Sequence, residues 1–148
     1  MNKLSSFTLI LFVFVMAIAC SEKKDTTAAA VNNDEWPEMD EFHMIMAESF
    51  HPYKDSSNLE PAKVNAADLA KLAEKWTTAP LPEKVNTDEV KANLEQLKND
   101  AAAFAQTVQT GDTTKIGESL TSLHDLFHKL QEAWYKPGKE GEEGHDHH

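Results

Sequence analysis

Residues 114–135 read TKIGESLTSLHDLFHKLQEAWY, and the spacing of their apolar side chains predicts a long helix. The large apolar residues recur at alternating intervals of four and three positions: Ile116, Leu120, Leu123, Phe127, Leu130 and Trp134. Such spacing places them in one stripe of a helix, which is typical of a surface buried against other helices. A Pro-Gly pair at 137–138 then ends the pattern. We therefore expect the last helix of a bundle here.

Two histidines of this stretch, His124 and His128, each follow a residue of the apolar stripe. Four positions are about one helical turn, so both imidazoles leave the same side of the helix, at the edge of the buried stripe. Imidazole is the commonest protein ligand of zinc, copper and haem iron. The pair therefore predicts either a shared metal ion or a haem ligand.

The same periodicity predicts three earlier helices, at residues 36–51, 61–77 and 88–110. Their expected apolar stripes are Met39, Phe42, Met46 and Phe50; Val64, Leu69, Leu72, Ala73 and Trp76; and Val90, Leu94, Leu97, Ala101, Phe104 and Val108. Pro52 should end the first helix, with a turn over residues 53–60. Because no segment alternates with a period of two, we expect an all-α fold, an up-down-up-down four-helix bundle over residues 36–136. The alternative is a three-helix arrangement with the second segment only partly ordered.

The first predicted helix also carries histidines, His43 beside its apolar stripe and His51 directly before Pro52, where it would cap the helix end. In the expected bundle the first and last helices are antiparallel neighbours. Counting ~1.5 Å per residue from their shared pole puts His43 and His124 at a similar height, with His128 near Met39. The sequence thus predicts a copper or zinc site built from His43, His124, His128, Met39 and His51, because a thioether also suits copper.

The helix order and two local features resemble a known superfamily. The run LFHKLQEAWY at 126–135 and the Ala-Pro-Leu-Pro break at 79–82 are similar to those of cytochrome c-prime and the soluble periplasmic b-type cytochromes. In the b-type members a Met of the first helix and a His of the last hold a non-covalent haem. The resemblance implies haem b between His128 and either His43 or Met39. The c-prime members carry CxxCH before the same turn, whereas residues 124–128 read HDLFH, which excludes covalent attachment.

The first 19 residues resemble a bacterial lipoprotein signal peptide, with Lys3, an apolar run over 9–19 and then the only cysteine, Cys20. The apolar run is shorter than the ~20 residues of a membrane-spanning helix. We expect an exported protein, a periplasmic or outer-membrane lipoprotein of a Gram-negative bacterium, held to the membrane by lipidated Cys20. Residues 20–35 would then be a flexible tether, and 137–148 a disordered acidic tail containing His145, His147 and His148.

Composition excludes several classes of function. The chain of 148 residues has 14 basic residues, all lysine, against 25 acidic ones, a formal net charge of −11. Such a surface repels nucleic acid and attracts cations. With Cys20 acylated, neither a thiolate zinc site nor a cysteine nucleophile is available.

These observations favour a metal-binding module for sensing, buffering or delivering copper or zinc, with a metal-trafficking or redox partner. The alternatives are a haem b electron carrier, and a ligand-free scaffold whose histidines are hydrogen-bonded boundary residues. Pairing of two protomers through a helix face stays open. An enzyme is not expected, because no nucleophile lies beside a base in a recognisable motif and no glycine loop could bind phosphate.

Overall fold

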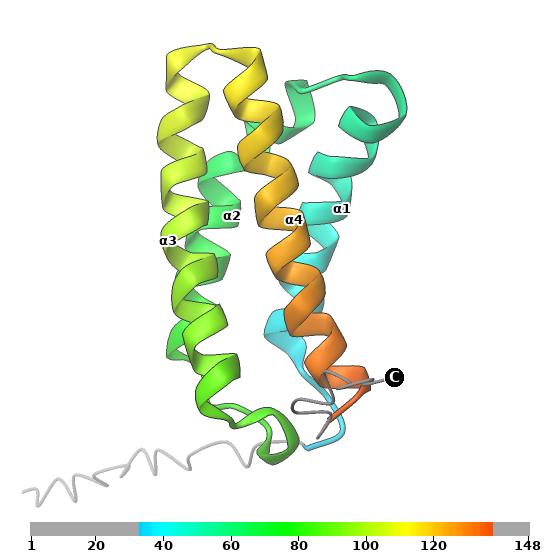
Figure 1. Cartoon of the computed structure of the whole chain (residues 1–148), viewed down its shortest axis with the longest axis vertical. Helices are drawn as coiled ribbons and strands as arrows, with labels where there is room; N and C mark the ends of the chain where they lie inside the picture. The colour runs from blue at the N-terminus through cyan, green and yellow to red at the C-terminus, as the bar shows by residue number, and fades with distance from the viewer. Residues whose placement is uncertain (1–32, 138–148) are drawn as a thin grey trace, which may run out of the picture.

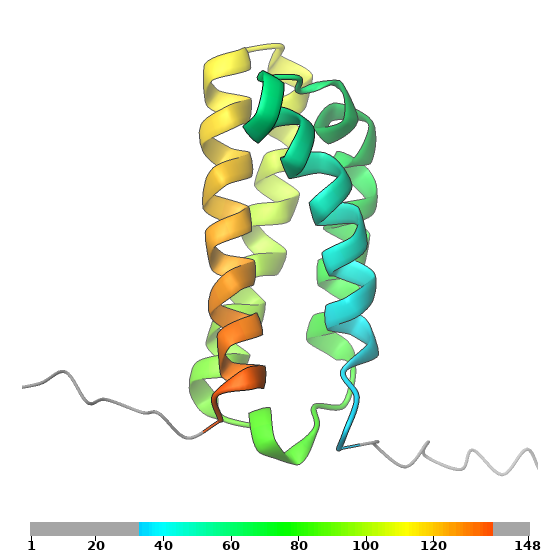
Figure 2. The same cartoon turned by 90° about the vertical axis from the view of Figure 1, so that its right-hand side faces the viewer.

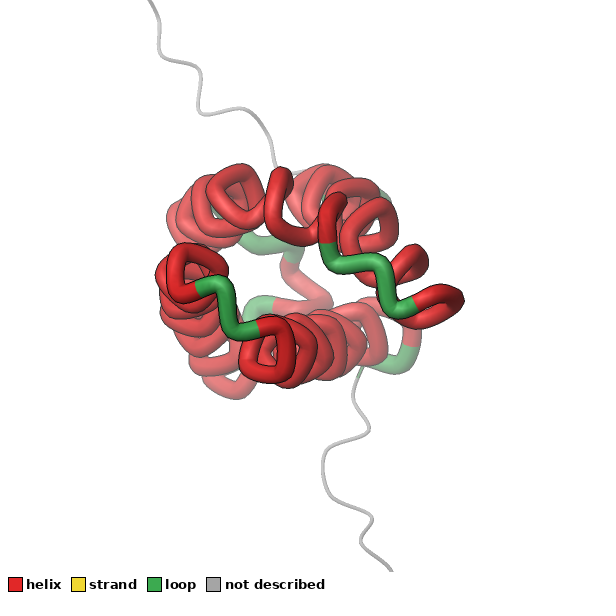
Figure 3. The backbone as a smooth tube through the Cα atoms, turned by 90° about the horizontal axis from the view of Figure 1, so that it is seen from above, coloured by secondary structure: helices red, strands yellow, loops and turns green. Residues whose placement is uncertain are grey.

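The computed structural model describes residues 33–137, which form four long helices and one 3-10 turn (Figure 1). In chain order the elements are α1 (Pro37–Ser56), α2 (Glu60–Thr78), η1 (Glu83–Val85), α3 (Asp88–Thr110) and α4 (Thr113–Tyr135). Each helix packs on the next, and α4 closes the ring against α1. Seen end-on, the helices are arranged in a ring (Figure 3), and their buried apolar side chains form one core cluster. The predicted four-helix bundle is confirmed, and the described residues contain no strand.

The boundary between α3 and α4 follows from local chemistry. Thr87 Oγ1 accepts a hydrogen bond from the Val90 N–H at 3.2 Å and so caps the start of α3. Gly111 ends that helix in the left-handed region, at φ 71°, where a residue with a Cβ would be strained. Asp112 then accepts from the Lys115 N–H at 3.2 Å and begins α4. One residue ends a helix and the next begins another, so α3 and α4 are necessarily adjacent and antiparallel.

The end of α1 differs from the prediction. The helix does not stop at His51 but continues through Pro52 to Ser56. A proline inside a helix removes one backbone hydrogen bond, but two others close the extra turn: Ser57 N–H donates to the Tyr53 carbonyl at 2.8 Å and Asn58 N–H to the Pro52 carbonyl at 3.1 Å. Tyr53 also packs against the core, beside Phe50. Residues 53–60 are therefore mostly helical, and the predicted turn shortens to 57–59.

The predicted buried face of α2 is confirmed at Leu69, Ala73 and Trp76, with Leu72 partly buried, but it is wrong at the start of the helix. Val64 is 76% exposed, and Ala62 and Ala66 are buried in its place. Alanine carries too little apolar surface to dominate a hydrophobicity pattern, so the first turns were assigned to the larger Val64. Small residues also let helices approach one another closely, and α2 packs extensively on both α1 and α3.

The helices α1 and α4 begin and end, respectively, at the same pole of the bundle (Figure 2), and three tryptophans pack together there. Trp36, which caps the start of α1 and is 1% exposed, lies edge-on to Trp76 with ring centroids 5.0 Å apart. It also lies 5.7 Å from Trp134, whose outer face is covered by Lys84 Nζ at 3.1 Å. Such clusters contribute beyond the area they bury, by about 0.5–1.5 kcal/mol per pair.

No described helix has an apolar stretch of the length and hydropathy needed to cross a membrane. The predicted signal peptide, Cys20, most of the tether and the tail from Gly138 onward lie outside the described residues.

Gly117 of α4 lies directly beside the ring of Tyr53 of α1. A Cβ placed on buried Gly117 would lie 2.5 Å from Tyr53 Oη and 2.8 Å from Cζ of the same ring. We expect Gly117→Ala to destabilise the bundle by about 1–3 kcal/mol, because overpacking outweighs the gain in helix propensity. Urea unfolding measures the effect. In a Tyr53→Ala background the ring is gone, and the same substitution should become neutral or stabilising; a stabilising Gly117→Ala in the natural chain would contradict the contact.

Candidate functional site

His124 and His128 of α4 meet through their imidazole rings. The two Nε2 atoms lie 3.0 Å apart, with ring centroids at 4.3 Å and planes at 79°. The arrangement arises from the four-residue spacing on one helix face, as the sequence predicts. The side chain of His124 is 21% exposed and His128 is exposed. His124 is thus packed against the bundle, whereas His128 is accessible to solvent.

Each Nδ1 of the pair has an oxygen atom beside it. His128 Nδ1 lies 3.1 Å from Gln131 Oε1, and His124 Nδ1 lies 3.5 Å from Asp125 Oδ1. The two Nε2 atoms lie within hydrogen-bond distance of each other, so in one tautomer an Nε2–H of one ring donates to the Nε2 of the other. In the tautomer with both protons on Nδ1, each Nδ1 donates to its oxygen and the two Nε2 lone pairs face each other, an arrangement that a cation bound to both would stabilise.

Two ring stacks between α1 and α4 hold the pair in place. Phe50 lies parallel to the His124 ring, with centroids 3.6 Å apart and planes at 12°. Reciprocally, His43 stacks on Phe127 at 5.2 Å and 21°. Each helix thus contributes one histidine and one phenylalanine. The packing of its ring on Phe50 thus fixes the rotation of the His124 side chain.

These stacks also correct the predicted heights. His43 was expected level with His124, but its ring packs against Phe127, while His124 packs against Phe50, seven residues further along α1. The offset is seven residues along α1, or ~10 Å, and three residues along α4, or ~4.5 Å, which is one to two helical turns. The prediction measured heights from His51, whereas α1 ends five residues later, ~7 Å further along its axis.

His51, predicted to cap the end of α1, lies instead within the helix and on its exposed side. It is close enough to His124 for the two charges to interact. The pKa of His124 lies below its ordinary value of 6.5, chiefly because burial disfavours the charged ring and further because His128 and His51 repel it; Asp125 offsets part of the effect. His124 is therefore held neutral, the form that binds metals.

The other predicted ligands are placed separately. Met39 is 3% exposed and packs in the core, and His43 is exposed beside Phe127. The described residues hold no group of three or more His, Cys, Asp or Glu side chains arranged to share a metal ion. Of the five predicted ligands, the structure brings His124 and His128 together. Their ligand roles, and those of His43, Met39 and His51, stay predictions.

Sequence reasoning missed Gln131 and Phe50 as parts of the site. Gln131 follows His128 by three residues, a spacing that places two helical side chains on one face. Its contact with His128 could therefore have been predicted from the sequence. Phe50 was assigned to the apolar stripe of the first helix, and it does lie in the core at 7% exposure. Its stack on His124 depends on the register between α1 and α4. This register cannot be predicted from the residue pattern of either helix alone.

A haem does not fit this arrangement. The ring would have to lie between α1 and α4, near His43, Met39 and His128, but aromatic side chains in mutual contact fill that part of the core. Phe42 lies 5.7 Å from both Phe127 and Trp76, measured between ring centroids. Phe127 additionally carries the ring of His43 on its face. Binding a macrocycle would require these side chains to repack.

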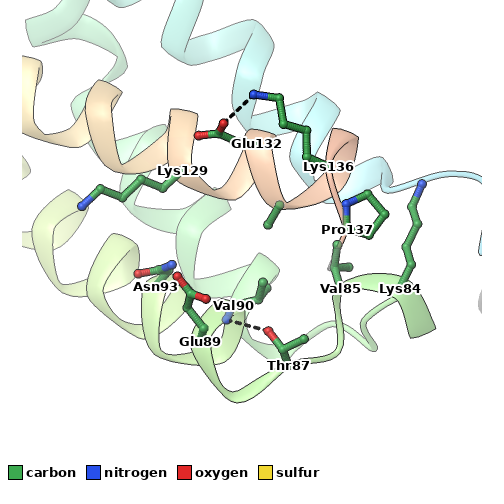
Figure 4. A pocket seen from close by; sticks show the side chains of 11 residues that line it. Lys84, Val85, Thr87, Glu89, Val90, Asn93, Lys129, Glu132, Lys136 and Pro137 are labelled. Atoms are coloured by element: carbon green, nitrogen blue, oxygen red, sulfur yellow. Dashed lines mark hydrogen bonds and ion pairs between the residues drawn. The ribbon is translucent and has the colours of Figure 1, made fainter. Parts of the chain in front are cut away.

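A groove of about 500 Å³ opens elsewhere, between η1, the start of α3 and the end of α4 (Figure 4). Three lysines line it, Lys84, Lys129 and Lys136, together with Glu89 and Glu132. Lys136 and Glu132 form an ion pair with 2.7 Å between Nζ and Oε1, drawn dashed in Figure 4. None of the predicted ligands lines this groove, so it is separate from the histidine pair.

The lowered pKa of His124 predicts how stability depends on pH. When the pH is below the ordinary pKa of about 6.5, the unfolded chain binds a proton at this ring more readily than the folded chain does. The free energy of unfolding therefore falls as the pH falls below about 6.5, and this loss is absent at higher pH. Urea titrations between pH 5 and pH 8 measure the slope. His124→Gln should flatten this part of the profile; an unchanged slope in the variant would contradict the assignment.

A scan of protein-family models, a search of curated proteins and a search of solved structures each returned no match.

Proposed function

We propose that the chain is an exported, lipid-anchored protein whose helical bundle binds a transition metal ion, zinc or copper, through His124 and His128. One observation carries the proposal: two imidazole Nε2 atoms lie 3.0 Å apart while each opposite Nδ1 contacts an oxygen acceptor. Histidines that bind metals commonly donate their other N–H to such an acceptor, which fixes the tautomer and increases ligand basicity. Gln131 and Asp125 would have that role here.

The separation of the two nitrogens suits a shared ion. With metal–nitrogen distances of ~2.0–2.1 Å, angles between a right angle and the tetrahedral value put two ligand nitrogens ~2.8–3.4 Å apart. The observed 3.0 Å lies within that range. The ion would need no change of rotamer at His124, which already stacks on Phe50. Pre-ordered ligands lose less conformational entropy on binding, which favours affinity.

Two ligands from the bundle leave the remaining coordination positions accessible, unlike a closed structural zinc site. This favours an ion that exchanges, as buffering, sensing or delivery requires. The net charge of −11 would raise the local concentration of cations around the chain. The metal module is therefore supported better than the haem carrier, for which the aromatic core leaves no room. The ligand-free scaffold, in which one Nε2–H donates to the other Nε2 across 3.0 Å, is the alternative that the binding test has to exclude.

The test uses the chain from Ser21 onward, which keeps every described residue, with His145, His147 and His148 replaced by alanine so that only the bundle binds. Calorimetric titration with Zn²⁺ or Cu²⁺ should show one ion per chain. His124→Ala and His128→Ala should each weaken binding by more than ~10-fold, the least that losing even an outer contact of a metal site costs.

A matched control comes from α1. His43→Ala removes an exposed imidazole that stacks on Phe127 rather than joining the pair, so its effect on affinity should be much smaller. Thermal unfolding adds a second readout, since bound metal raises stability only in chains that keep the pair. Equal binding by the natural pair and by His124→Ala would leave the scaffold as the better account.

A further inference from the structure

We infer that the groove between η1, the start of α3 and the end of α4 binds a small organic dicarboxylate, with one carboxylate at Lys84 and the other at Lys129. The groove has a volume of about 500 Å³, which lies within the ~300–1,000 Å³ of small-molecule sites. No residue of the histidine pair lines it, so the inference does not depend on the proposed function.

Lysines without a carboxylate partner are few among the described residues, and two of them line this groove. Seven described lysines form ion pairs with a carboxylate: Lys63, Lys71, Lys75, Lys91, Lys98, Lys115 and Lys136. The other three in the described part of the chain are Lys54, Lys84 and Lys129. In a chain whose acidic residues outnumber basic ones by 25 to 14, the two lysines of the groove are available to a carboxylate from outside.

Lys84 is held in position by an aromatic ring. Its Nζ lies 3.1 Å from the centroid of the Trp134 ring, so one side of the ammonium group faces the π system. Trp134 is 8% exposed and lies 5.7 Å from Trp36 between ring centroids, which makes it a fixed support. A ring face attracts a cation without neutralising it, and the remaining N–H donors of Lys84 can bind a carboxylate.

Lys129 lies at the opposite end of the groove from Lys84 (Figure 4). It precedes Trp134 by five positions on α4, or ~7.5 Å along the helix axis, and its side chain is exposed. Figure 4 also shows the amide of Asn93, a second N–H donor, on the Lys129 side. The two ammonium groups are thus too far apart to share one carboxylate, and a ligand that contacts both needs an acidic group at each end.

The surface between the two lysines is largely apolar. Val85 and Val90 lie between them in Figure 4; both are buried, and half-buried Ala133 also lines the groove. Glu132 and Lys136 form an ion pair with each other at 2.7 Å, so together they add little net charge. A ligand whose carboxylates are joined by methylene groups suits this lining, because a polar linker would lose hydrogen bonds to water there.

The chemistry of the groove favours carboxylate over phosphate. Phosphate is commonly held by arginine forks or by a helix N-terminus. All 14 basic residues of the chain are lysines, and the first turn of α3 carries Asp88 and Glu89, which disfavour an anion at that helix end. One lysine at each end suits a group with a single negative charge. Glu89 itself lines the groove, so removing its charge should strengthen binding.

The experiment is calorimetric titration of the chain from Ser21 onward with the dicarboxylates glutarate, pimelate and azelate, and with heptanoate, the monocarboxylate of the same length as pimelate. We expect pimelate or azelate to bind one per chain, about 3–10-fold more tightly than heptanoate, because a second carboxylate contacts a second, solvent-accessible lysine. Glutarate is too short to contact both lysines and should bind no more tightly than heptanoate.

Substitutions identify the two ends of the site. Lys84→Met and Lys129→Met each keep an aliphatic stem and remove one ammonium group, so either should abolish the preference for the dicarboxylate. Lys54→Met is the matched control: it changes the net charge equally, at a lysine in the last turn of α1 that does not line the groove, and should keep the preference. Glu89→Gln should increase the affinity for pimelate.

Several results would overturn the inference. These are no binding at any ligand length, equal affinities for pimelate and heptanoate, or a preference for pimelate that survives both Lys84→Met and Lys129→Met. Equal losses in Lys54→Met and Lys84→Met would assign the binding to overall charge rather than to the groove. His124→Ala should bind pimelate as the natural chain does, so failure here leaves the metal proposal untouched.

Discussion

The reciprocal stacking of one histidine and one phenylalanine from each of α1 and α4 is the contact on which the site depends. Phe50 on His124 and His43 on Phe127 set how far one helix is displaced along the other. The same contacts bury part of His124, lower its pKa and aim its Nε2 at His128. The packing of α1 on α4, the register between the two helices and the protonation of His124 therefore depend on the same ring contacts, and a change in any of these rings should alter all three.

Much of the architecture was readable from periodicity and capping. The apolar stripes of α3 and α4 are buried where they were expected, with partial exposure at Val108, and Thr87 and Asp112 begin these helices through side-chain hydrogen bonds. The contact between His124 and His128 also follows from their spacing, because one helical turn is a local property. Signals confined to a few neighbouring residues were thus reliable.

What sequence reasoning missed depended on tertiary packing. Pro52 reads as a helix end, yet α1 continues past it, and Tyr53 in the added turn packs beside Phe50 and Gly117. Val64 reads as a core residue, whereas alanines on the opposite face allow α2 to approach its neighbours. The position of His43 relative to His124 inherits the first of these errors. Which atoms the imidazole N–H groups contact depends on side-chain rotamers, and these cannot be predicted from the sequence.

An even number of antiparallel helices returns the chain to the pole where it started, so Pro37 and Tyr135 lie at the same end of the bundle (Figures 1 and 2). A segment joined before α1 therefore leaves the bundle from the same pole as one joined after α4, and the Ser57 and Gly111 turns lie at the opposite pole (Figure 1). The histidine pair lies on the side of the bundle rather than at either pole, so attachment of the chain at its ends leaves the pair approachable from the side.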